Sequence, residues 1–468
     1  MNALIILSVI GFIALLSEIF NFRKFLSAVV LTGIAIAFIA NACEWNTAIS
    51  YYHRMMVFDN YAVAFTGVIL LVAFLWFILS PGFFKEETSR SDHFTLILFS
   101  LAGAVVMISY ANMTMLFLGI EILSIPMYVL AGSKKSDLRS NEAAVKYFLL
   151  GAFATCFLLF GIALIYGATG SFDLAEIRGI GYRVTGTPSI SLYPISSIPL
   201  FYGGVIMMMV GLAFKISAVP FHFWTPDVYD GSPDVITAFM ATIVKTAAFA
   251  AFFRLFFTSF TAIIPNWSII LWVMAILTII TGNLTAVFQH GLKRMLAYSS
   301  IAHAGYMLLA LIAMNNLSQS SLLLYTASYS IATIAAFAVM IIVINKKGND
   351  DFDSFRGLAK NNPFVALVMC IAMFSLAGIP PTAGFFAKYF IFSAAMQSHH
   401  IGLVIIAVAG SLVGVYYYFR VVIAMFQGEE EALEKIMLEP SYKFLLFITS
   451  LIIIILGLFP SLLINLLH

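Results

Sequence analysis

The sequence has few charged residues, and this shortage decides the class of protein. Only 10% of its 468 residues are Asp, Glu, Lys or Arg, whereas 62% are hydrophobic. A soluble domain has about 25% charged residues, because its surface must be covered by groups that bind water. The composition therefore excludes a soluble fold of this length and indicates a polytopic membrane protein. The formal net charge of +2 also excludes the strongly basic field of a nucleic-acid-binding protein.

Cysteines and nucleotide-binding motifs are scarce as well. The three cysteines, Cys43, Cys156 and Cys370, are far apart and lack C-x-x-C spacing, so the sequence offers no thiolate set for an iron–sulfur cluster, a structural zinc or a disulfide framework. No G-x-G-x-x-G motif follows a strand, and no G-x-x-x-x-G-K-[ST] loop occurs. We therefore expect no bound nucleotide. Energy for any transport must come from an ion gradient or from a partner.

Long apolar segments are what the sequence has in place of charge. A helix needs about 20 apolar residues to cross the hydrocarbon core of a bilayer, and fourteen segments are candidates. The predicted spans are 2–20, 25–41, 61–80, 94–110, 112–132, 142–166, 198–217, 235–257, 268–288, 292–314, 320–345, 364–396, 401–426 and 442–465. The connection 167–197 contains Gly, Pro and Ser without a helical period and is predicted to be a loop. The predicted fold is all-α.

The basic residues between the spans predict the orientation. An even number of spans places both termini on one side, and Lys and Arg accumulate in cytoplasmic loops. One set of connections carries fifteen basic residues, and the other carries only Arg54, Arg178 and Arg183. Both termini are therefore predicted to face away from the cytoplasm.

Two segments, 212–226 and 375–388, do not read as plain spanning helices. Prolines and glycines interrupt both of them, and these residues remove or weaken helical hydrogen bonds. Non-helical backbone at membrane depth is tolerated only inside protein or beside a hydrated cavity, and paired interruptions point to an ion site in a repeated fold. We expect broken helices in spans 7 and 12, and a repeat of spans 4–8 in spans 9–13. Ordinary proline kinks are the simpler alternative.

Six ionisable side chains inside predicted spans are candidates for a function, because each such group costs about 2.5–3.5 kcal/mol on insertion scales. They are Glu121 (span 5), Lys146 (span 6), Lys215 (span 7), Lys245 (span 8), His303 (span 10) and Lys388 (span 12). An ion pair would explain Glu121 and one lysine only. A lysine taken out of water can exchange its proton near neutral pH, whereas an arginine cannot. The pattern therefore predicts a proton relay in which Glu121, close to Lys215, controls the charge of that lysine.

Structural alternatives remain open for these residues. Glu121 and Lys215 can form a static pair, and Lys245 and Lys388 can have fixed protonation states. Lys146 can reach the membrane interface, and His303 can be a packing residue. Asp227, Asp230 and Asp234 lie in a turn between spans 7 and 8 and are more typical of capping than of proton collection. His222 is also more typical of a structural side chain.

Three segments resemble a known family. Residues 215–233, 293–306 and 378–388 resemble the antiporter-like membrane subunits of proton-pumping NADH:quinone oxidoreductase, respiratory complex I, and the resemblance is strong over about 110–395. Residues 225–231, the basic Lys388 and the end of the chain after span 14 favour the N branch of this family. The resemblance implies fourteen helices, with two inverted five-helix repeats and broken helices 7 and 12. It divides the chain into N-terminal helices (1–110), a translocation core (111–395) and C-terminal helices (396–468).

The resemblance also implies roles for residues. Glu121 and Lys215 resemble the ion pair of helices 5 and 7, Lys245 the central lysine, Lys388 the residue that discharges outward, and Lys146 a further lysine of helix 6. It implies that protons move from the cytoplasm to the outside of the bacterial inner membrane, coupled to quinone reduction in other subunits. NADH, FMN, iron–sulfur clusters and quinone are expected in those subunits, and no cofactor in this chain.

The resemblance also implies partners. The expected partners are neighbouring antiporter-like and small membrane subunits, in a hetero-oligomer within the lipid bilayer. Two other functions remain open. In the first, the chain is a subunit of a multi-subunit cation/proton antiporter. In the second, it is a passive scaffold whose buried charges serve assembly.

Overall fold

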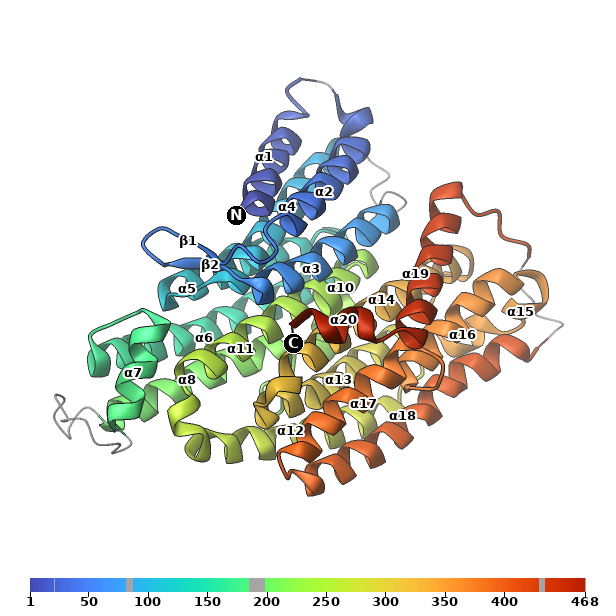
Figure 1. Cartoon of the computed structure of the whole chain (residues 1–468). Helices are drawn as coiled ribbons and strands as arrows, with labels where there is room; N and C mark the ends of the chain where they lie inside the picture. The colour runs from blue at the N-terminus through green and yellow to red at the C-terminus, as the bar shows by residue number, and fades with distance from the viewer. Residues whose placement is uncertain (21, 81–86, 185–197, 429–433, 468) are drawn as a thin grey trace.

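The computed structural model describes residues 1–20, 22–80, 87–184, 198–428 and 434–467, and the description below concerns these residues. They form a bundle of long helices with one small hairpin (Figure 1). The first elements are α1 (Asn2–Leu16), η1 (Arg23–Phe25), α2 (Leu26–Ala42), β1 (Ile49–Tyr51), β2 (Met56–Phe58) and α3 (Asn60–Leu79). The two strands are antiparallel, with Ser50 opposite Val57.

The next helices form the first five-span unit, in which two spans are interrupted. They are α4 (Glu87–Ser109), α5 (Met113–Ala131), α6 (Leu138–Thr169), α8 (Ile198–Ile216) with α9 (Trp224–Gly231), and α10 (Asp234–Phe239) with the π-helical η4 (Met240–Val244) and α11 (Lys245–Ser259). A short helix, α7 (Leu174–Val184), lies between α6 and α8.

A second five-span unit follows. It consists of η5 (Thr261–Ile263) with α12 (Ile264–Val287), α13 (Leu292–Ala313), α14 (Asn316–Lys347), α16 (Pro363–Ala377) with α17 (Ala383–Gln397), and α18 (Ile401–Phe426). The short η6 (Phe352–Phe355) and α15 (Leu358–Asn361) connect α14 to α16. The chain ends with α19 (Pro440–Leu458), α20 (Ser461–Ile464) and η8 (Asn465–Leu467).

Contacts between the ends of helices define two faces. The N-terminal ammonium of Met1 pairs with Glu44 at 2.7 Å, and Leu466 lines one cavity with Asp59. We call this side the terminal face. On the opposite face, Lys293 bonds the turn between α9 and α10. Because α4 begins on the opposite face and α12 begins on the terminal face, the two five-span units are inverted relative to each other.

Reciprocal glycines hold the first two helices of each unit together. A Cβ at Gly103 of α4 would collide with the backbone of Ile122 and Leu123 in α5, and a Cβ at Gly119 of α5 would lie 2.7 Å from the Met107 nitrogen. The second unit repeats this crossing. There, Gly282 of α12 lies against the Ala302 backbone, and a Cβ at Gly305 of α13 would lie 2.9 Å from the Ile279 nitrogen. In each unit the backbones are too close for a side chain in between.

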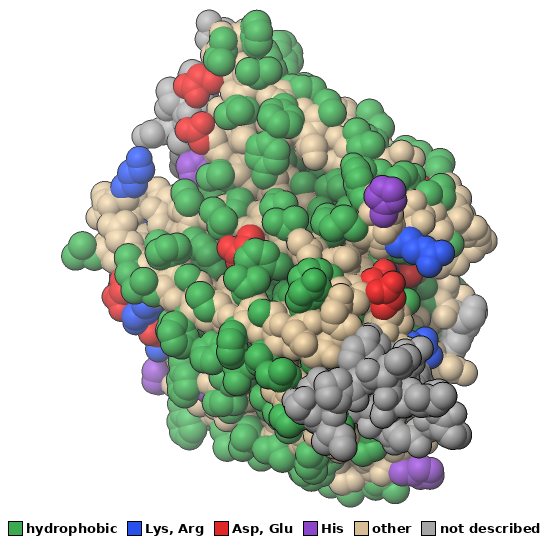
Figure 2. Space-filling model, turned by 90° about the vertical axis from the view of Figure 1, so that its left-hand side faces the viewer, with side chains coloured by type: hydrophobic (Ala, Val, Ile, Leu, Met, Phe, Trp, Pro, Cys, Tyr) green, Lys and Arg blue, Asp and Glu red, His purple; other side chains and the backbone are tan. Residues whose placement is uncertain are grey.

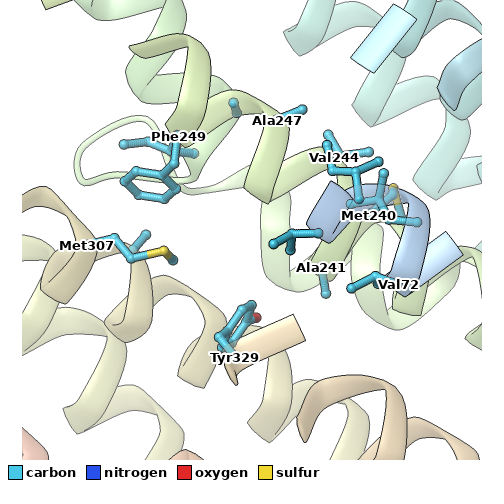
Figure 3. Close-up of a cluster of buried hydrophobic side chains, with 14 of the residues drawn as sticks. Val72, Met240, Ala241, Val244, Ala247, Phe249, Met307 and Tyr329 are labelled. Atoms are coloured by element: carbon cyan, nitrogen blue, oxygen red, sulfur yellow. The ribbon is translucent and has the colours of Figure 1, made fainter. Parts of the chain in front are cut away.

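The centre of the bundle is the span made of α10, η4 and α11. Every residue from Val235 to Phe256 is buried. Figure 3 shows apolar side chains of this span meeting Val72 of α3, Met307 of α13 and Tyr329 of α14. Ionisable groups on these helices are therefore enclosed by protein. By contrast, the face in Figure 2 is covered mostly by hydrophobic side chains with few charges, as suits contact with lipid or another subunit.

The fold confirms most of what the sequence predicts. In the described part of the chain, eleven helices are long and apolar enough to cross a membrane, and shorter apolar helices cover the three other predicted spans. The breaks lie at 217–223 and 378–382, as predicted.

The loop predicted at 167–197 is wrong over its first part, because α6 continues to Thr169 and α7 follows. The glycines of α7 weaken its helical pattern in the sequence. The helix nevertheless buries Leu174 and Ile177, which lie three residues apart on one face. Residues 185–197 lie outside the described residues.

Candidate functional site

Lys215 lies at the end of the first half of a broken helix. It is the penultimate residue of α8, and only 5% of it is exposed. Its ammonium donates to the Ser124 hydroxyl at 2.8 Å and to the Tyr128 hydroxyl at 3.2 Å. Both acceptors belong to α5 and are four residues apart, so they share one face of that helix. The carbonyl end of α8 also favours a positive charge at this position.

The expected contact between Glu121 and Lys215 is absent among the described residues. Glu121 is half-buried, and its Oε1 is buried without a hydrogen-bond partner. At 3.6 residues per turn, Glu121 is rotated by about 60° around α5 from Ser124. Glu121 therefore lies at the edge of the α5 face that binds Lys215, between Ser124 and the exposed Leu118 and Ile122. The sequence places both groups at similar depth, but it does not fix the rotation of the two helices.

Lys245 is the first residue of α11, directly after the π-helical turn η4. Only 2% of it is exposed. Its ammonium donates to the Ser300 carbonyl at 2.8 Å and also contacts the Ser300 hydroxyl. π-Helical turns inside α-helices occur frequently at functional sites. Here the turn directly precedes Lys245, which is the one basic residue between Val235 and Arg254 in the central span.

His303 lies three residues after Ser300 on α13, within the same buried region. Its Nδ1 is hydrogen-bonded with the Tyr325 hydroxyl at 2.7 Å, and its Nε2 with the Tyr418 hydroxyl at 3.1 Å. Both ring nitrogens therefore have a partner that can either donate or accept. Such a ring can take up a proton on one side and release one on the other.

Lys388 lies on α17, the second half of the other broken helix, and is 6% exposed. Its ammonium reaches back across the break to the Ala377 carbonyl at 2.7 Å, and it donates to the Ser411 hydroxyl at 2.9 Å. Ala377 is the last residue of α16, so the negative end of that helix dipole faces the ammonium.

A small cavity of about 10 Å³ lies between His303 and Lys388. This volume is about the minimum for one water molecule. Ser328, Tyr329 and Ser375 are among the residues that line the cavity. The Ser328 hydroxyl is buried without a hydrogen-bond partner. A water in this cavity would find partners on both sides of the gap.

Lys146 belongs to a different environment. It is 39% exposed and forms ion pairs with Glu142 at 2.6 Å and Asp227 at 2.7 Å. These groups line a cavity of about 290 Å³ with Asp230 and Arg294 on the face opposite the termini. The sequence groups Lys146 with the buried lysines, whereas the structure places it in a charged cluster.

Four lysines are buried in the described part of the chain, and one of them, Lys293, pairs with Asp234 at 2.7 Å. The other three, Lys215, Lys245 and Lys388, have no carboxylate within 4.0 Å, and each donates hydrogen bonds only to hydroxyl and carbonyl oxygens. A buried charge without a counterion is costly and tends to neutralise instead. Neutral oxygens can accept from the ammonium form, and hydroxyls can donate to the amine form. The sites therefore suit groups that change protonation state.

Reasoning from the sequence does not find the neutral partners of Lys215, Lys245, His303 and Lys388. They are Ser124, Tyr128, Ser300, Tyr325, Ser411 and Tyr418. Serine and tyrosine are common in membrane helices, so composition gives no signal. The spacing of Ser124 and Tyr128 on one helical face could have drawn attention to that pair. Over the ranges described, no group of three or more His, Cys, Asp or Glu side chains could hold a metal ion.

Comparison with known proteins gives the family of the chain. A family described as NADH:quinone oxidoreductase/Mrp antiporter, TM matches residues 111–414. NADH-quinone oxidoreductase subunit N of Cytophaga hutchinsonii is 43% identical over 99% of both chains. Its counterpart from Trichlorobacter lovleyi is also 43% identical, over 91% of this chain and 87% of its own.

Solved structures agree as well. A chain of respiratory complex I from Thermus thermophilus with bound aureothin superposes with a TM-score of 0.82 and 34% identity, over 99% of this chain and 98% of its own. A chain of the Mrp complex from Dietzia sp. has a TM-score of 0.87 at 20% identity, over 100% of this chain and 96% of its own. The second likeness shows the fold alone. The chain therefore belongs to the NADH:quinone oxidoreductase/Mrp antiporter membrane family, and within it to the subunit N branch.

Proposed function

We propose that this chain translocates protons as a membrane subunit of NADH:quinone oxidoreductase, through a relay made of Lys215, Lys245, His303 and Lys388. The observation that carries the proposal is that each lysine is enclosed by protein and bound only to neutral oxygens. A lysine kept for packing alone would gain from a carboxylate partner, or from replacement by leucine. A lysine that must release its proton gains from having neither.

Glu121 biases the first step of this relay. Its carboxylate lies on α5 one turn before Ser124, which binds the Lys215 ammonium. Charges in a low-dielectric interior interact well beyond contact distance. A change in the charge or position of Glu121 therefore alters the proton affinity of Lys215. Redox energy from the rest of the enzyme acts at this point, and the proton then passes through Lys245 and His303 to Lys388.

The redox groups belong to other subunits. NADH, FMN, iron–sulfur clusters and quinone bind elsewhere in the enzyme, and this chain contributes to the membrane arm beside other antiporter-like and small membrane subunits. The chain lies in the bacterial inner membrane. The excess of Lys and Arg in the connections opposite the terminal face supports an orientation with both termini outside. Protons then move from the opposite, cytoplasmic face outward. The division into 1–110, 111–395 and 396–468 remains a prediction.

The test replaces the lysines in the intact enzyme. Lys245→Met, Lys215→Ala and Lys388→Ala are each expected to lower the number of protons pumped per NADH oxidised by sealed membrane vesicles, while NADH oxidation continues. Wild-type pumping in Lys245→Met, or in both of the other variants, would overturn the relay. A scaffold role instead predicts intact pumping with a changed yield of the complex. An antiporter role predicts sodium-dependent proton exchange without co-purifying flavin.

A further inference from the structure

A cavity of about 540 Å³ opens on the terminal face, close to the central span. It lies between the start of α3, the end of α11, the start of α14 and the C-terminal η8. Asp59, Tyr61, Arg254, Thr258 and Gln319 are among its lining residues. A cavity of this volume holds many water molecules. Its place beside α11 is notable because α11 begins with Lys245.

The cavity has a charged floor. Arg254 binds Asp59 at 2.6 Å, and the side chain of Arg254 is only 9% exposed. Asp59 also accepts from the Ala62 nitrogen at 2.8 Å and so caps α3, which fixes its position. The Nε group of Arg254 is buried without a hydrogen-bond partner. An unpaired guanidinium N–H beside a polar cavity favours ordered water there. Arginine does not deprotonate, so this pair keeps the floor hydrated without exchanging protons itself.

Polar groups follow one face of α11 from Lys245 to this floor. Thr246, Ala250 and Arg254 are four residues apart and share a face, with about 6 Å between successive positions. The Thr246 hydroxyl, next to Lys245, is hydrogen-bonded with the Ser330 hydroxyl at 3.2 Å. One turn further, the Tyr61 hydroxyl donates to the Ala250 carbonyl at 2.8 Å. Water molecules that bridge polar groups on successive turns would complete the chain from Thr246 to Tyr61.

We propose that this cavity is the vestibule through which protons held by Lys245 leave toward the terminal face, by way of Thr246, Ser330 and Tyr61. The inference rests on the proposed function and adds a release route to it. The Lys245 ammonium loses one proton and becomes a neutral amine. Each hydroxyl or bridging water accepts one proton and passes another on, and one proton enters the vestibule water. Lys245 regains a proton from the Lys215 side of the relay. Lys388 is then not required for release by this route.

Two tyrosines provide a matched test of this route. Tyr61 and Tyr110 are both buried, and each donates at 2.8 Å to one of two consecutive α11 carbonyls, those of Ala250 and Ala251. Tyr61 lines the cavity, and Tyr110 is not among the residues that line it. Tyr61→Phe and Tyr110→Phe therefore remove the same kind of hydrogen bond while keeping the ring. The measured quantity is protons pumped per NADH oxidised by the whole enzyme in sealed vesicles. The share of this chain is its contribution to pumping, and it equals the difference in protons pumped per NADH between the wild-type enzyme and Lys245→Met.

A second arm closes the vestibule from outside. Thr258→Cys places a thiol in the cavity, and Asn266→Cys places one on the same face at the exposed start of α12. Both are made in a background with Cys43→Ser and Cys156→Ser, because these two native cysteines are exposed. Each variant is prepared with and without reaction of intact cells with a bulky, membrane-impermeant methanethiosulfonate reagent, which reaches the terminal face before the vesicles are made. This comparison within one variant is independent of any effect of the substitution on folding.

The expected result is loss of part of the share of this chain in Tyr61→Phe and in modified Thr258→Cys, with the remainder carried through Lys388 and lost when Lys245→Met is added. Tyr110→Phe and modified Asn266→Cys are expected to keep the share. Full pumping in Tyr61→Phe or in modified Thr258→Cys, while Lys245→Met loses its share, would overturn the vestibule and leave the relay standing. Full pumping in Lys245→Met itself would instead overturn the proposed function.

Discussion

The two broken helices place a lysine at the break in opposite ways. In the first, Lys215 precedes the break and binds hydroxyls of a neighbouring helix, α5. In the second, Lys388 follows the break and binds the final carbonyl of its own first half. Both breaks begin with a residue of positive φ, Ser217 at 64° and Gly378 at 85°. The interruption is thus shared, but the partner of the charge is supplied differently.

This difference separates what the repeat fixes from what each half adds. The repeat fixes an interrupted backbone with free carbonyl groups at membrane depth, which can accept from a cation. Each half then adds its own hydroxyls. The first half also has Glu121 on α5, one turn from the Lys215 partner Ser124. The second half has the small cavity beside Lys388. We therefore expect substitutions of the shared framework to act alike in both halves, and substitutions of the added groups to act differently.

The largest effect is expected at the glycine crossings. Gly103→Ala and Gly282→Ala each place a Cβ against the backbone of the neighbouring helix. Overpacking of this kind costs about 1–3 kcal/mol, and these contacts involve backbone that cannot rotate away. Both variants should lower the yield of assembled enzyme strongly and to a similar degree, as measured by the amount of complex recovered from membranes and its aggregation temperature in detergent.

Gly167→Ala is the control for this comparison. Gly167 also lies in a helix, α6, but a Cβ there would meet no atom within 4 Å. The substitution should be neutral or stabilise by up to about 1 kcal/mol through helix propensity. A strong loss for Gly103→Ala with a wild-type yield for Gly282→Ala would show that the two crossings are not equivalent.

The same comparison shows how far the sequence alone predicts this protein. Spans, breaks and intramembrane charges follow from hydropathy, from Pro380 and Pro381, and from the cost of burying a lysine. The rotation of helices does not follow. Glu121 forms no contact with Lys215 in the described residues, and no residue pattern fixes how α5 and α8 are rotated toward each other. Uncharged partners such as Ser300 also leave no signal, since a serine in a membrane helix more often bonds its own backbone.

A smaller effect is expected at Ser328, which belongs to the second half only. Its buried hydroxyl has no partner and lines the cavity between His303 and Lys388. Ser328→Ala removes a hydrogen-bond partner from a water in that cavity, at a cost of about 1 kcal/mol. Proton transfer from His303 to Lys388 should slow several-fold, measured as the pumping rate of vesicles at fixed NADH oxidation.

Ser320→Ala is the matched control for Ser328→Ala. Ser320 lies on the same helix, α14, and its hydroxyl is also buried without a partner. Ser320 is not among the residues that line the cavity. The enzyme with Ser320→Ala should pump at the wild-type rate. Equal slowing in both variants would assign the effect to α14 packing and would remove the role of the cavity.

The smallest effect is expected at Lys146, whose surroundings are the reverse of those of Lys388. Lys146 is partly exposed and paired with two carboxylates, Glu142 and Asp227. Such pairs contribute about 0–1 kcal/mol, and an ammonium between two carboxylates keeps its charge instead of passing a proton on. Lys146→Met should therefore leave protons pumped per NADH close to wild type, as should Glu142→Gln. A loss as large as that of Lys245→Met would mean that burial without a counterion is not what selects the working lysines, and the distinction between the charged cluster and the relay would have to be abandoned.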